Sequence, residues 1–107
     1  MKQWELFNYP FPSADQPHPA IIISNPGICQ NPNIEFVNVL FGQSVRPITR
    51  PKKENEVYLD TSDGLDGKTL FKCDMIFQVP KKLLLQKRGA VSPQRIEEIR
   101  RKFRQFF

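Results

Sequence analysis

The sequence predicts a mainly β domain, folded as a small barrel or curled sheet, that ends in an α-helix. Up to about residue 80, short segments rich in Ile, Val, Phe and Leu are separated by clusters of Pro, Gly, Asn and Asp. From residue 92 the apolar residues recur instead at helical spacing. The 107 residues have the size of one domain. We therefore expect a single domain over residues 1–107, with the β-barrel in about 1–80 and a basic helix in about 92–107.

Five segments of the β region have the composition of strands. Prolines follow the first segment, Asn-Pro pairs follow the second, and Asp-Gly precedes the last, as turns require. Residues 20–23, Ala-Ile-Ile-Ile, are apolar at every position, which is typical of a central strand that is buried on both faces. The five predicted strands are residues 4–7, 20–24, 35–41, 56–59 and 70–79.

The C-terminal segment has the start signal and the apolar stripe of an amphipathic helix. Ser92 and Pro93 suit the N-cap and the first helical position. One stripe then contains four apolar residues, Ile96, Ile99, Phe103 and Phe106. The other side contains five cations, Arg95, Arg100, Arg101, Lys102 and Arg104.

The net charge of +5 is unevenly distributed along the chain. Residues 81–107 contain nine basic and two acidic residues, a net charge of +7, whereas residues 1–80 have a net charge of −2. This asymmetry suits an anionic partner, either a nucleic acid or an acidic polypeptide that the tail would recruit, although a solvated helix face explains it equally well.

Other functional classes lack their signals. Cys29 and Cys73 stand far apart without a histidine cluster, so we expect buried free thiols and neither a metal site nor a disulfide. The five glycines form no phosphate-binding loop, so we expect no nucleotide cofactor. Because the N-terminus lacks an apolar core and no apolar run could cross a bilayer, we expect a cytoplasmic protein without membrane contact.

Two groups of residues offer acid–base chemistry. His18 lies between Pro17 and Pro19 at a strand entrance and is a candidate acid or base, or a surface histidine without a role. Strand alternation places Lys72 and Asp74 on one face, where they could hold a phosphodiester and move a proton. Taken alone, a structural salt bridge between these two is the better interpretation, and Cys73 would point to the opposite face.

Two further groups could contact a nucleic acid. Residues 44–53 form a basic segment in which Ser44, Arg46, Arg50, Lys52 and Lys53 are candidate phosphate contacts, with solvated loop charge as the alternative. The N-terminal aromatic residues could stack bases if they line a groove, although such residues are more often part of a core. These residues are Trp4, Phe7, Tyr9 and Phe11.

The order of three motifs resembles the MazF/PemK family of toxin–antitoxin ribonucleases. They are His-Pro-Ala-Ile-Ile-Ile-Ser-Asn at residues 18–25, Lys-Cys-Asp-Met-Ile-Phe-Gln-Val at residues 72–79, and Lys-Arg-Gly-Ala-Val-Ser-Pro at residues 87–93. The resemblance implies an SH3-like small barrel with a MazF/CcdB-like fold, usually a homodimer. It also implies metal-independent cleavage of single-stranded RNA and inhibition by an antitoxin with an acidic tail.

The motifs match the family only in part, so the chain resembles a divergent member. Asp74 matches the acid of the family's Cys-Asp pair, and Lys72 stands where an arginine can precede that cysteine. His18 stands where most members have the arginine of Arg-Pro, and Phe77 replaces another family arginine. Ser44 is the nearest candidate for the hydroxyl that members place after the third core strand.

The expected function is therefore a toxin-like endoribonuclease. RNA cleavage without a metal needs a base, an acid and a cation at the phosphorane. We assign His18 as the general base or acid, Lys72 as the charge stabiliser, Asp74 as the group that orients one of them, and Ser44 as a phosphate contact. The alternative is a degenerate member that binds nucleic acid or protein without catalysis, as the CcdB-like gyrase poisons do. A structural domain that docks through its basic helix is the third interpretation.

Overall fold

A computed structural model describes residues 1–45 and 52–107 of the chain. The strands are β1 (Glu5–Ser13), β2 (Gln16–Ile22), β3 (Phe36–Ser44), β4 (Glu56–Leu59), β5 (Thr69–Lys72), β6 (Phe77–Pro80) and β7 (Gln86–Ala90). The α-helices are α1 (Pro26–Gln30) and α2 (Pro93–Phe106), and the 3₁₀ helices are η1 (Thr61–Asp63) and η2 (Lys81–Leu83).

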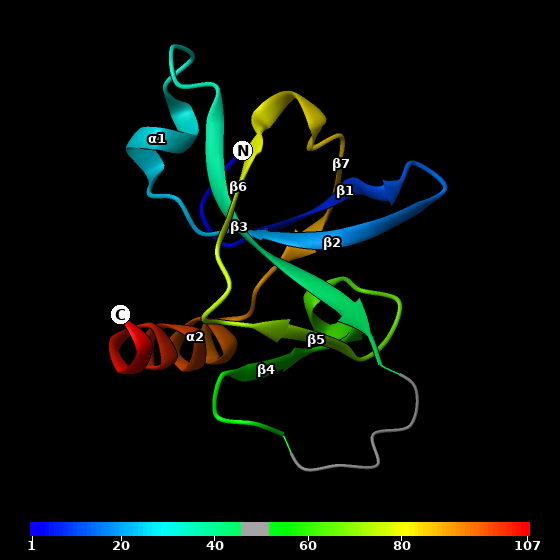
Figure 1. Ribbon diagram of the computed structural model, residues 1–107, viewed down its shortest axis with the longest axis vertical. Coiled ribbons are helices and arrows are strands. Elements are labelled where there is room, and N and C mark those ends of the chain that lie inside the picture. The colour runs from blue at the N-terminus through cyan, green and yellow to red at the C-terminus, as the bar shows by residue number, and fades with distance from the viewer. Residues whose placement is uncertain (46–51) are drawn as a thin grey trace.

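The strands form one curled, antiparallel half-barrel. The order is β4-β5-β3-β2-β1-β7, and β6 pairs with β3 beside β5. Helix α2 lies against β4 at one end of the sheet, and α1 lies at the other end (Figure 1). The expected mainly β fold with a C-terminal helix is confirmed. The helices of the described ranges are all too short or too polar to cross a bilayer.

The core consists of two clusters on opposite faces of the sheet. Ile21 and Leu40 belong to the first cluster, which α2 covers, while Ala20 and Ile22 belong to the second, which includes Cys29 of α1. Successive residues of β2 therefore pack into different clusters, and all three have no exposed surface. The prediction of a central strand buried on both faces is confirmed.

Helix α2 begins as predicted, at Pro93 after the N-cap residue Ser92, but the Ser92 hydroxyl makes no capping hydrogen bond. Its stripe packs on the first cluster through Ile96, Ile99 and Phe103, and Ile99 is completely buried. Phe106, in the last turn, remains 38% exposed. The stripe thus covers the half-barrel with its first three members only.

Four elements differ from the sequence predictions, namely β1, β2, α1 and β7. Strand β1 extends to Ser13 and strand β2 begins at Gln16, so both strands include prolines that were expected in a turn. Residues 26–30 form α1, which begins with proline and is capped by Asn25, whose Oδ1 accepts the Ile28 amide at 3.0 Å. Strand β7 pairs with β1, so the sheet ends at Ala90 and not near residue 80.

The predicted strand 70–79 is broken into β5 and β6. Both halves pair with the same edge of β3, but their registers differ: Gly42 is opposite Phe71, whereas Val39 is opposite Phe77. Three residues along β3 thus correspond to six residues along the segment from β5 to β6. The extra residues form a turn at 73–76. Such an insertion bends a strand and redirects its side chains. The expected alternation of Lys72 and Asp74 on one strand face is therefore wrong.

Candidate functional site

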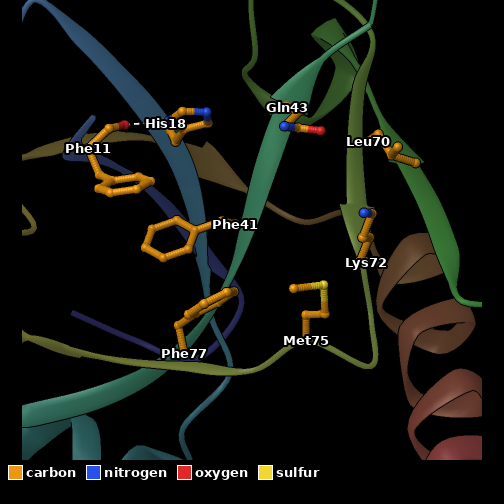
Figure 2. A pocket seen from close by; sticks show the side chains of 8 residues that line it. All are labelled: Phe11, His18, Phe41, Gln43, Leu70, Lys72, Met75 and Phe77. Carbon is orange, nitrogen blue, oxygen red and sulfur yellow. Dashed lines mark hydrogen bonds between the residues drawn. The ribbon is translucent and has the colours of Figure 1, made fainter. Parts of the chain in front are cut away.

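A pocket of about 180 Å³ lies where the β1–β2 hairpin, β3 and the break between β5 and β6 meet. Figure 2 shows the side chains of Phe11, Phe41 and Phe77 in a column on one side of this pocket, with Gln43, Leu70, Lys72 and Met75 across from them. His18 completes the lining. The break between β5 and β6 helps to build the pocket, because four of the eight lining residues lie in it or within a few residues of it. These are Leu70, Lys72, Met75 and Phe77.

A second, more polar pocket of about 450 Å³ adjoins the first. Both pockets include His18 and Gln43 in their lining, so together they form one groove along β2 and β3. Ser44, at the end of β3, lies in the second pocket. The remaining lining residues of this pocket are Pro12, Gln16, Pro17, Pro19 and Gly42.

The half-buried His18 is fixed by a hydrogen bond to the neighbouring strand. Its Nδ1 lies within hydrogen-bond distance of the Phe11 carbonyl oxygen, as the dashed line in Figure 2 marks. A carbonyl oxygen only accepts, so we assign the ring proton to Nδ1. The lone pair of a neutral imidazole is then on Nε2, which is the atom that can accept a proton from a substrate.

Lys72 supplies a cation to the same pocket. It is the last residue of β5, directly before the turn, and its side chain is exposed. In Figure 2 its ammonium lies across the pocket from the phenylalanine column. The structure therefore brings His18 and Lys72, two of the three candidate catalytic residues, to one pocket.

Asp74 lies in the turn and does not line either pocket. Its Oδ1 accepts a hydrogen bond from Asn55 Nδ2 at 2.9 Å. The bond that orients His18 comes from Phe11 instead. Asp74 thus fixes the turn that follows Lys72.

Both cysteines are buried free thiols, as the sequence predicts. Cys73 has no exposed surface, and burial raises the pKa of its thiol to about 12. The thiolate is the reactive form of cysteine, so Cys73 is a core residue and does not supply a nucleophile.

The basic segment is only partly described. Arg46 and Arg50 lie outside the described residues. Lys52 forms an ion pair with Glu98 of α2 at 2.8 Å, and the Lys53 amide donates to Glu56 Oε1 at 2.8 Å. Lys52 is thus held against the helix.

The N-terminal aromatic residues divide between the core and the groove. Trp4 packs on the first core cluster, and Phe7 and Tyr9 pack on the second. Phe11, which is 58% exposed, lines the first pocket. Five lining residues of the first pocket were not predicted from the sequence: Phe41, Gln43, Leu70, Met75 and Phe77. Alternation along β3 was the available signal for Phe41 and Gln43, which share one face.

Most C-terminal cations contact the body of the domain. Lys87 pairs with Glu5 at 2.5 Å, Arg88 pairs with Asp66 at 2.7 Å, and the Arg100 guanidinium lies 5.7 Å from the centre of the Trp4 ring. Further internal contacts are made by Lys81, Arg95, Lys102 and Arg104. Most of the cations of residues 81–107 therefore pair with, or cap, groups of the same chain.

Across residues 1–45 and 52–107, no three His, Cys, Asp or Glu side chains gather as they would around a metal ion.

Comparisons with known proteins agree with this architecture. The sequence model of the family described as PemK-like, MazF-like toxin of type II toxin–antitoxin system matches residues 2–107. A search of curated proteins gives no match. Among solved structures, a mycobacterial endoribonuclease in complex with its cognate antitoxin superposes with a TM-score of 0.78 at 19% identity, covering 99% of this chain and 93% of that one.

Two further structures share the fold. The Mycobacterium tuberculosis toxin MazF-mt6 gives a TM-score of 0.76 at 17% identity, with coverage of 96% of this chain and 95% of that one. A second mycobacterial endoribonuclease gives 0.75 at 20% identity, with coverage of 99% and 89%. The half-barrel with its C-terminal helix is thus the fold of these toxins.

Proposed function

The chain belongs to the PemK-like, MazF-like toxin family of type II toxin–antitoxin systems, and on that premise we propose that it cleaves single-stranded RNA without a metal ion. The observation that carries the proposal is that His18 and Lys72, a proton acceptor and a cation, line one pocket. Ser44 lies in the adjoining pocket of the same groove.

The reaction that these groups can support is attack by a ribose 2'-hydroxyl on the adjacent phosphorus. His18 Nε2 takes the hydroxyl proton as the bond from O2' to phosphorus forms. The Lys72 ammonium stabilises the negative charge on the phosphorane oxygens. The bond from phosphorus to O5' then breaks, O5' takes a proton from the imidazolium or from water, and the products are a 2',3'-cyclic phosphate and a 5'-hydroxyl end.

The other candidate residues act around this centre. Asp74, through Asn55, holds the turn that follows Lys72 and so positions the ammonium. The Ser44 hydroxyl contacts a neighbouring phosphate. Arg46, Arg50 and Lys53 add phosphate contacts without sequence preference, and Lys52 joins them if it exchanges its ion pair with Glu98 for a phosphate.

We also propose the partners that accompany this function. One neighbour in fold was solved with its cognate antitoxin, and an antitoxin with an acidic segment would be attracted to this chain, whose net charge is +5. A homodimer in the cytoplasm is the expected assembly. Light scattering at micromolar concentration tests the dimer, and a strict monomer would remove it.

The test of catalysis uses purified protein and an end-labelled single-stranded RNA in the presence of a chelator. General acid–base catalysis contributes roughly 10²- to 10⁴-fold to a rate, so His18→Ala is expected to lose about that factor. Lys72→Ala should also be slow and Lys72→Arg partly active, whereas Lys82→Ala, an exposed lysine outside the groove, should match the parent.

Equal cleavage by the parent and by His18→Ala and Lys72→Ala would refute the assigned roles. Expression of the parent in cells separates the remaining alternatives. Growth arrest with new 5'-hydroxyl RNA ends supports the nuclease, and arrest without them supports a poison that acts by binding.

A further inference from the structure

We infer that the 180 Å³ pocket is a subsite for one unpaired RNA base, stacked on the phenylalanine column and selected by the Gln43 amide. This inference rests on the proposed function, because it takes RNA as the ligand of the groove.

The Phe11 and Phe77 rings of the column remain exposed, whereas the Phe41 ring next to both of them also packs on the second core cluster. The Phe11 and Phe41 rings are stacked, 6.3 Å apart with an interplanar angle of 29°, and the Phe41 and Phe77 rings are 5.1 Å apart and tilted by 50°. Phe11 is 58% exposed and Phe77 is 41% exposed, although apolar side chains of this size are usually buried. Exposed aromatic faces beside a cation are the platform on which single-stranded nucleic acids stack their bases.

The size and the walls of the pocket fit a single base. An apolar cavity of about 150 Å³ accepts a benzene ring, so a space of about 180 Å³ accommodates one planar heterocycle. Across from the rings, Leu70 and the flexible thioether of Met75 supply an apolar second wall. A flat aromatic ligand can therefore be sandwiched between the two sides.

Polar groups at the rim indicate which aromatic ligand this is. His18 and Lys72 border the pocket, so a ligand whose ring enters it has its linked phosphate beside a cation. Gln43 lies where the two pockets join and is the one amide among the eight lining residues. Its side chain offers a donor and an acceptor together, which is the pattern that reads a base edge. The base in this subsite thus belongs to a nucleotide next to the cleaved bond.

The test measures binding without cleavage, by fluorescence anisotropy. The probes are single strands of ten 2'-deoxynucleotides, which cannot be cut because they lack the attacking 2'-hydroxyl. An abasic strand with the same number of phosphates shows the binding that does not depend on bases. Stacking of one base changes affinity by roughly 5- to 150-fold. The parent should therefore bind at least one of the base-containing strands more tightly than the abasic strand, by about this factor.

Matched variants separate stacking from general effects of substitution. Phe77→Leu and Phe11→Leu should each remove much of the preference for bases over the abasic strand. Phe36→Leu should retain it, because Phe36 has a similar exposure of 44% on β3 but lies outside the pocket. Gln43→Ala should make affinities for the different bases more equal, whereas Gln78→Ala, an exposed glutamine of β6, should not.

The outcomes distinguish this inference from the proposed catalysis. Equal binding of base-containing and abasic strands by the parent, or an equal loss in Phe36→Leu and Phe77→Leu, overturns the base subsite even if RNA is cleaved. Base-dependent binding that Phe77→Leu and Phe11→Leu abolish supports the subsite even if the parent cleaves no RNA.

Discussion

Replacing Asp63 by alanine should destabilise the domain by roughly 3 to 6 kcal/mol, because it removes a buried carboxylate that accepts two backbone hydrogen bonds. Asp63 is 2% exposed. Its Oδ2 accepts the Asp60 amide at 3.1 Å and its Oδ1 accepts the Ser92 amide at 3.0 Å. One side chain thus closes the η1 turn and holds the start of α2.

The magnitude follows from these two bonds. A hydrogen bond to a charged group contributes about 1.5 to 3 kcal/mol, and an abandoned buried donor keeps its desolvation cost. Asp63→Asn retains one acceptor oxygen, so it should lose about half as much as Asp63→Ala. Asp66→Ala is the matched control, because Asp66 forms an ion pair with Arg88 at 2.7 Å but its side chain is 94% exposed. Exposed ion pairs contribute about 0 to 1 kcal/mol.

The assay is urea denaturation followed by far-ultraviolet circular dichroism, which gives the free energy of unfolding for each variant. The expected order of destabilisation is Asp63→Ala, then Asp63→Asn, then Asp66→Ala. If Asp63→Ala lost less than about 1 kcal/mol, or no more than Asp66→Ala, the two backbone bonds would not hold η1 and α2 as argued.

Three further predictions concern packing, thiol reactivity and pH. A Cβ at Gly42 would lie 2.5 Å from a core phenylalanine ring, so Gly42→Ala should lose about 1 to 3 kcal/mol in the same assay, whereas Gly67→Ala, which meets open space, should not. Because burial raises the pKa of the Cys73 thiol to about 12, iodoacetamide should modify Cys73 slowly in the folded protein and rapidly in urea; fast labelling when folded would contradict its burial. Burial alone would raise the pKa of Glu5, but hydrogen bonds from Lys87 and the backbone outweigh it and hold that pKa below 4.5. The pair of Glu5 and Lys87 therefore stabilises the fold above pH 4.5, and this stabilisation is lost as the pH falls through the lowered pKa. Lys87→Met should raise the NMR titration midpoint of Glu5. An unchanged midpoint would count against the pair.

Two elements were predictable because local signals and tertiary packing agree. The run Ala20 to Ile23 is apolar at each position, and β2 is indeed covered on both faces. Ser92 and Pro93 mark the start of α2, where a backbone N–H has no acceptor within the helix, so proline, which has no N–H, loses no hydrogen bond. In both elements the local sequence pattern agrees with the burial that the fold gives those residues.

Other features depend on partners that are distant in the sequence. Residues 70–79 have the composition of a continuous strand, and only their pairing with β3 shows that three residues are extra. Strand β7 is polar and lacks apolar alternation, so its sequence does not indicate a strand. Its place in the sheet depends on backbone pairing with β1. The groove arises from the same long-range pairing, so His18 and Lys72 were identifiable as candidates while the aromatic wall opposite Lys72 was not.

The structure also changes what the uneven charge means. In the sequence, the +7 of residues 81–107 stands beside a body with a net charge of −2, as if the tail were free to attract an anion. In the fold, Lys87, Arg88 and Arg95 pair with acidic groups of that body. An ion pair has little field at a distance, because its two charges nearly cancel and salt screens the remainder. These three pairs fasten the C-terminal segment to the half-barrel, and they leave the net charge of the chain at +5. For the recognition that we propose in the groove, the local groups are Lys72, the oriented His18 and apolar rings whose contribution salt does not screen.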